Sequence, residues 1–155
     1  MPHIPEGTDP EDWHRYFAIE CNNRAWELAV QPRSEERDRE MLNCAHASAL
    51  HWNVAGTELN DMRARTLLAE VHALLGFGSS ALVYADQVRA FFLDKDPADW
   101  ELAFIHTIHA HAAYVAGRSD LHVSSYEEAV RAIEAIADDE DRKIVLETFN
   151  LLAKP

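Results

Sequence analysis

The sequence contains little cysteine, glycine or proline, and it has no long apolar run. Its two cysteines, Cys21 and Cys44, form no CxxC motif and no disulfide framework, so we expect both to act as small hydrophobic residues. No apolar stretch approaches the length of a membrane span. Residues 1–10 also lack the basic start and apolar run of a secretory signal. The sequence therefore predicts a soluble, cytoplasmic protein.

Basic residues are scarce as well. The chain has 14 lysines and arginines against 27 aspartates and glutamates, which gives a formal net charge of −13. Proteins bind nucleic acids and anionic membranes largely through lysine and arginine. The charge balance therefore argues against both kinds of partner, and it favours a basic partner if the protein has one.

Several catalytic motifs are missing from the sequence. It contains no glycine-rich phosphate-binding loop, no nucleophile elbow and no His-Glu-x-x-His pattern. These absences argue against a nucleotide hydrolase, an α/β-hydrolase and the common type of zinc protease. We therefore favour a protein without enzymatic activity.

What the sequence does contain is the pattern of an all-helical protein. A chain of 155 residues with 48% hydrophobic residues can bury a core within one domain. Apolar residues recur at three- and four-residue spacing, and no segment alternates for long enough to indicate a strand. We predict a flexible segment at residues 1–10 and a single domain at residues 11–155.

Capping and breaking residues divide this domain into about seven helices. Asp9 with Pro10, Ser34 and Thr57 are typical starts for the first three helices. The same reasoning places the later starts at Ser79 or Ser80, Pro97, Ser125 and Asp138. Because short loops join antiparallel neighbours, the predicted architecture is a stack of antiparallel helix hairpins.

Two stretches of the sequence look alike. The segment from His72 to Gly78 parallels the segment from His111 to Gly117, and each precedes a helix rich in small residues. Repeats of this size are typical of helical-hairpin solenoids. Residues 126–136, with the sequence YEEAVRAIEAI, resemble the second helix of such a repeat. On these features, residues 57–137 resemble the tetratricopeptide-repeat family.

The resemblance implies a right-handed superhelix whose concave groove binds a peptide of another protein or docks another subunit. The connection near residues 121–123 is expected to be a loop that is longer than usual for the family. Polar positions outside the apolar stripes are the candidates for contacting the partner, namely Arg63, Glu70, Gln87 and Glu101.

Nine histidines suggest an alternative function. His106 and His109 are three residues apart, so they project from one helical face and could share zinc or another divalent metal. A third ligand, such as His46 or His51, would leave one coordination position open for water, as in a metal-dependent hydrolase. A buried histidine that is hydrogen-bonded within the core would produce the same pattern.

Three hypotheses follow from the sequence. The first is a non-enzymatic protein-interaction domain that requires no cofactor, and the second is a metal-binding helical bundle. The third is a structural subunit that associates with itself, for example as a homodimer.

Metal content separates the second hypothesis from the other two. If His106 and His109 hold a metal, chelator-free protein is expected to contain near-stoichiometric zinc or iron. The His106→Ala, His109→Ala double variant should lose that metal, as measured by elemental analysis. Background metal in both proteins would contradict the hypothesis.

Overall fold

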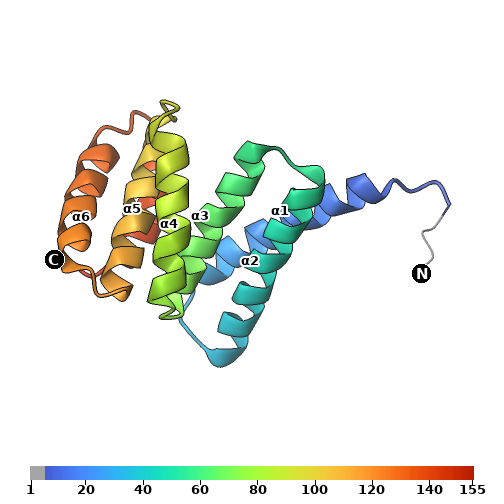
Figure 1. Ribbon diagram of the computed structural model, residues 1–155, viewed down its shortest axis with the longest axis horizontal. Coiled ribbons are helices and arrows are strands. Elements are labelled where there is room, and N and C mark those ends of the chain that lie inside the picture. The colour runs from blue at the N-terminus through green and yellow to red at the C-terminus, as the bar shows by residue number, and fades with distance from the viewer. Residues whose placement is uncertain (1–5) are drawn as a thin grey trace.

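The computed structural model describes residues 6–155, and these residues form seven α-helices (Figure 1). In chain order they are α1 (Pro10–Ala29), α2 (Glu35–Ala55), α3 (Glu58–Leu74), α4 (Gly78–Leu93), α5 (Asp99–Val115), α6 (Ser119–Glu134) and α7 (Asp139–Phe149). The all-helical fold class is confirmed. Of the flexible segment predicted at residues 1–10, residues 1–5 lie outside the described part of the chain, and Pro10 already belongs to α1. None of the helices within residues 6–155 combines the length and apolar character that a membrane crossing requires.

Four helices begin where the sequence predicts. The side chains of Asp9, Ser34, Thr57 and Asp138 each accept a hydrogen bond from a backbone N–H in the first turn of their helix. These bonds satisfy donors that the helix itself leaves free. Local capping chemistry was therefore sufficient to place the starts of α1, α2, α3 and α7.

The other three predicted starts are wrong. α4, α5 and α6 begin after Phe77, Ala98 and Arg118, and none of these residues makes a side-chain capping bond. Ser125 is buried inside α6, and residues 121–123, which we predicted to be a loop, belong to the same helix. No capping signal marks these helices because tight turns and packing, rather than side-chain caps, set where they begin.

The helices pack as antiparallel pairs, with α1 against α2, α3 against α4 and α5 against α6. The first helices of the pairs, together with α7, also pack in a row in the order α1, α3, α5 and α7. Within residues 6–155, the second helices α2, α4 and α6 do not contact one another. The first helices therefore form the inner face of the stack, and the second helices lie outside them.

The turns that end α3 and α5 are alike and lie 41 residues apart. Gly76 and Gly117 occupy the same place after the first helix and have φ angles of +80° and +73°. In both turns, the N–H of the residue after the glycine donates to the carbonyl oxygen five residues earlier. Phe77 donates to His72 over 2.8 Å, and Arg118 donates to Ala113 over 2.9 Å. With this offset of 41 residues, the position of Glu70 in α3 corresponds to that of His111 in α5. The sequence analysis aligned His72 with His111 instead, which was an error of two residues.

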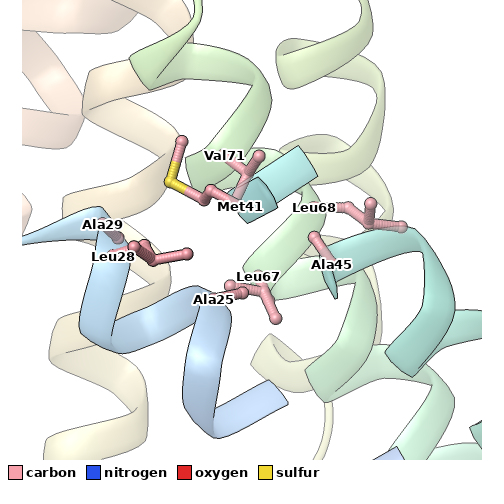
Figure 2. Close-up of a cluster of buried hydrophobic side chains, with 8 residues drawn as sticks. All are labelled: Ala25, Leu28, Ala29, Met41, Ala45, Leu67, Leu68 and Val71. Carbon is pink, nitrogen blue, oxygen red and sulfur yellow. The ribbon is translucent and has the colours of Figure 1, made fainter. Parts of the chain in front are cut away.

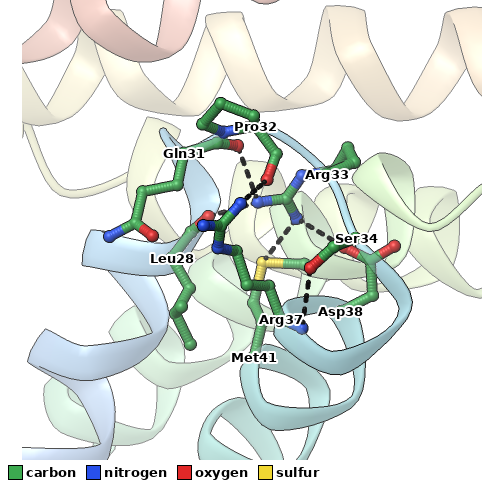
Figure 3. Close-up of polar contacts among 8 residues, drawn as sticks. All are labelled: Leu28, Gln31, Pro32, Arg33, Ser34, Arg37, Asp38 and Met41. Carbon is green, nitrogen blue, oxygen red and sulfur yellow. Dashed lines mark hydrogen bonds and ion pairs between the residues drawn. The ribbon is translucent and has the colours of Figure 1, made fainter.

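The turn between α1 and α2 is held by arginine side chains (Figure 3). Arg33 donates to the carbonyl oxygens of Leu28 and Gln31, and it pairs with the Asp38 carboxylate over 3.1 Å. Arg37 donates to the Pro32 carbonyl oxygen over 3.0 Å. These bonds satisfy carbonyls at the carboxyl end of α1 and fix the angle at which α2 leaves the turn.

The core consists of several apolar clusters along the stack. The cluster in Figure 2 joins the first pair to α3 through Leu28, Met41, Leu67 and neighbouring small residues. More than half of the buried hydrophobic residues are alanines. Helices with such short side chains at their contacts can approach each other closely.

Two helices approach each other closely at Gly78, the first residue of α4. A Cβ at this position would lie 2.5 Å from the carbonyl oxygen of Val115 and 2.7 Å from Ala116 Cα, at the end of α5. Such distances are far below van der Waals contact, and both neighbours are backbone atoms. Only glycine therefore fits between α4 and α5 at this point.

We expect Gly78→Ala to lower the free energy of unfolding by about 1–3 kcal/mol, because the added methyl group forces the two helices apart. Urea denaturation monitored by circular dichroism measures this change. The matched control is Ser119→Ala at the equivalent, exposed position of α6, for which a change within about 0.5 kcal/mol is expected. Equal stability of wild type and Gly78→Ala would contradict the packing argument.

Candidate binding groove

The inner face of the stack contains a pocket of about 440 Å³. All four helices of the inner row contribute side chains to it. The lining residues are Asn22, Trp26 and Glu27 of α1 with Val30 directly after it, Arg63 and Thr66 of α3, Trp100, Glu101, Phe104 and Ile105 of α5, and Ile144, Glu147 and Thr148 of α7. We call this pocket the inner groove. Its volume lies in the range typical of ligand sites.

Helical spacing brings these side chains to one face of each helix. Trp26 and Val30 are four residues apart, as are Trp100 and Phe104, and such residues project from the same side. The Trp26 and Phe104 rings lie 5.7 Å apart, and the Trp100 and Phe104 rings lie 6.4 Å apart in an edge-to-face arrangement. The wall of the groove is thus a connected group of aromatic rings from α1 and α5.

A bidentate ion pair crosses the groove from α3 to α5. Arg63 Nε donates to Glu101 Oε2 over 2.8 Å, and Arg63 Nη2 donates to Glu101 Oε1 over 3.1 Å. These hydrogen bonds raise the pKa of the Arg63 guanidinium. The guanidinium also lies 5.7 Å from the centre of the Trp100 ring, within the range of a cation–π contact. Arg63 therefore holds Glu101 and Trp100 in fixed orientations.

The charge of the lining is negative. Three glutamates, Glu27, Glu101 and Glu147, line the groove together with a single cation, Arg63, which Glu101 already neutralises. Arg24 pairs with Glu27 over 3.0 Å at the edge. Glu147 forms no ion pair with any residue in the described part of the chain. The groove therefore offers an apolar surface with an uncompensated carboxylate.

The four partner-contacting candidates from the sequence are in different environments. Arg63 and Glu101 lie in the inner groove and contact each other, but Glu101 is buried rather than at the surface as we expected. Glu70 is fully buried between α3 and α5, so its selection as a surface residue was wrong. Gln87 is exposed on α4, outside the groove lining, and accepts a hydrogen bond from Arg65 over 2.7 Å.

The sequence reasoning missed the aromatic part of the groove. Trp26, Trp100 and Phe104 look like core residues because they recur with helical spacing, and each is in fact partly buried. One signal in the sequence could have identified them. These large aromatic residues lie on helices whose other contacts are made by alanine. Side chains of that size do not fit between closely packed helices.

Glu70, which we had expected at the surface, forms a buried ion pair with His111. The two carboxylate oxygens of Glu70 lie 3.0 and 3.1 Å from His111 Nδ1. Burial by itself would lower the pKa of His111, but the charge of Glu70 and its hydrogen bond outweigh burial and raise that pKa. The pair joins α3 to α5.

His106 and His109, the proposed metal ligands, face other partners. His109 Nδ1 lies 2.7 Å from Ser125 Oγ and His109 Nε2 lies 2.8 Å from Asp86 Oδ1, so both ring nitrogens are engaged. His106 Nε2 is 3.6 Å from Glu128 Oε2. Burial lowers the pKa of both histidines. Neither His46 nor His51 joins them, and no three potential ligands converge on a metal position within residues 6–155.

Ser125, His109 and Asp86 are the residue types of a catalytic triad, but their arrangement does not suit catalysis. In a serine hydrolase, His Nε2 activates the serine and Nδ1 faces the acid; here the two nitrogens have the opposite partners. Ser125 is also fully buried and lies outside the inner groove, so no substrate can reach its Oγ. The three residues form a hydrogen-bonded link between α4, α5 and α6.

The buried ion pair gives a test that depends on pH. A His111 pKa above the unfolded value of about 6.5 contributes stability that is complete below that value and is lost as the pH rises through the folded pKa. We expect Glu70→Gln to lower the free energy of unfolding by about 3 kcal/mol near pH 6. The loss should become smaller toward pH 9, because the His111 ring loses its charge as the pH rises through its folded pKa.

Urea denaturation at the two pH values measures these losses. The control is Glu127→Gln, at an exposed position of α6. This variant should change the free energy of unfolding very little at either pH. A pH-independent effect of Glu70→Gln would show that the charge of His111 plays no part.

No protein-family model, curated protein or solved structure matches this chain. The comparisons therefore add nothing to the tetratricopeptide-repeat resemblance of residues 57–137. Any function for the chain has to be inferred from the geometry and charge of its own surfaces, and the inner groove is the feature from which we infer it.

Proposed function

We propose that this protein is a non-enzymatic interaction domain that binds a segment of another protein in the inner groove. The observation that carries this proposal is the composition of the groove, with an apolar aromatic wall shared by α1 and α5 and a border of carboxylates. In peptide recognition, apolar pockets take anchoring side chains and charges at the border select the flanking residues. The tetratricopeptide-repeat resemblance supports the same use of a concave surface.

The partner that fits this groove is a short basic segment with at least one large apolar side chain. The apolar side chain would lie against Trp26, Trp100 and Phe104, where it would bury area that is now partly exposed. A lysine or arginine beside it would meet Glu147, the carboxylate that has no ion pair in residues 6–155. The net charge of −13 would attract such a segment from a distance.

Selection from a random peptide library displayed on phage tests this proposal, with binding of each selected peptide measured by fluorescence polarisation. We expect the selected peptides to combine an aromatic or long aliphatic residue with neighbouring lysine or arginine. Thr66→Trp should weaken their binding at least about tenfold, equivalent to about 1.4 kcal/mol, because the indole fills the groove. The Thr66 hydroxyl bonds only within its own helix, to the Met62 carbonyl oxygen, so the substitution leaves no partner unsatisfied.

Two further variants separate the groove from the rest of the surface. Glu147→Lys should reduce the affinity for basic peptides, and the reduction should shrink at high salt. Gln87→Ala, outside the groove, should leave the affinity unchanged. Peptides that bind wild type and Thr66→Trp equally well would refute binding in the inner groove.

A further inference from the structure

Two histidine rings on neighbouring helices face each other through their nitrogen atoms. His46 is exposed on α2, and His72 is almost buried on α3. Their Nε2 atoms are 3.3 Å apart, whereas the ring centroids are 5.4 Å apart and the ring planes are inclined by 60°. The rings therefore meet at their nitrogen edges, and the lone pairs of both Nε2 atoms can point into the space between them.

Ser80 lies within hydrogen-bond distance of the second nitrogen of His72. The Ser80 hydroxyl has a carbonyl acceptor, the Phe77 oxygen at 3.2 Å, so its own oxygen can accept a further hydrogen bond. His72 Nδ1 lies 2.7 Å from that oxygen and can donate to it when the ring proton is on Nδ1. In that tautomer His72 Nε2, the atom facing His46, carries no proton. A hydrogen bond from the second nitrogen is the usual support of a metal-binding histidine.

The distance between the two nitrogens fits a shared metal ion. Two imidazole nitrogens at about 2.0–2.1 Å from a tetrahedral zinc ion lie about 3.3 Å from each other. The other histidine pair provides a comparison. His14 Nδ1 and His51 Nδ1 are 2.8 Å apart, which is a direct hydrogen-bond distance and too short for two ligands of one such ion.

The surroundings of His72 hold its ring in this orientation. Phe77 and Tyr84 contact it edge-to-face, with centroid distances of 5.8 and 5.4 Å. Burial and the neighbouring His46 lower the pKa of His72, which favours the neutral form of its ring. A neutral, fixed imidazole beside an exposed one is a favourable arrangement for binding a cation from solution.

We propose that His46 and His72 bind a divalent transition-metal ion of the zinc type through their Nε2 atoms. Imidazole ligands suit zinc, copper and nickel better than magnesium or calcium. Two protein ligands leave further coordination positions for water or for a group of a partner molecule. Neither histidine lines the inner groove, so this site does not depend on the function proposed for the groove.

Isothermal titration of tag-free, chelator-treated protein with zinc chloride tests the site, and cobalt chloride provides an absorption signal for the coordination geometry. We expect one zinc ion per chain. His46→Ala should weaken binding at least about tenfold, because it removes one of two ligands. His51→Ala, on the same helix, should leave zinc binding unchanged. Because His46 is exposed, its replacement does not disturb the core, and circular dichroism confirms the fold of each variant.

A second pair of variants tests the orienting role of Ser80. Ser80→Ala retains both nitrogens but removes the hydrogen bond to His72, and it should weaken zinc binding about tenfold. Its exposed neighbour Ser79 gives the control variant Ser79→Ala, which should bind zinc like wild type. The proposal is overturned if wild type binds no zinc, if His46→Ala binds it equally well, or if the loss occurs in the His106→Ala, His109→Ala variant instead.

Discussion

The close approach of helices across alanine-lined contacts is the constraint on which the rest of this structure depends. Alanine supplies most of the buried apolar positions, and at Gly78 even a methyl group would collide with the backbone of α5. Large side chains cannot enter such contacts. Trp26, Trp100 and Phe104 line the inner groove, and Trp26 and Phe104 pack there against an alanine-rich cluster.

Close packing also determines the polar interior. α5 contacts α3, α4, α6 and α7, and eleven of its residues are buried, three of them histidines. Each of these histidines lies next to a carboxylate from a neighbouring helix, namely Glu70, Asp86 or Glu128. A contact between a histidine and a carboxylate requires a specific distance and direction, whereas a contact between alanine side chains does not. The histidines therefore fix the register in which the helices of the stack meet.

The two proposed sites use different features of the same helix stack. The inner groove is built by the first helices, and its chemistry is apolar with an excess of carboxylate. The His46–His72 pair lies where α2 meets α3, with Ser80 of α4 behind it, and its chemistry is that of imidazole nitrogen. A ligand of one site would not compete with a ligand of the other. Occupation of either would be expected to stabilise the contacts of α3, which contributes residues to both.

The sequence by itself determined the helical class, the approximate number of helices and the starts of those with side-chain caps. Asp9, Ser34, Thr57 and Asp138 act on donors within their own first turn, so no distant residue is needed to predict them. It also selected Arg63 and Glu101 as polar positions outside the apolar stripes; Arg63 is exposed, whereas Glu101 is buried beside it in the inner groove.

Only the tertiary structure decided the starts of α4, α5 and α6, the 41-residue offset between the turns that end α3 and α5, and the partner of each histidine. Glu70 looked like a surface residue because its charge is visible in the sequence, whereas the His111 ring that neutralises it lies 41 residues away. His46 and His72 are 26 residues apart and meet only because α2 packs on α3. Distances between side chains on different helices depend on how the helices pack, and local patterns contain no information about that packing.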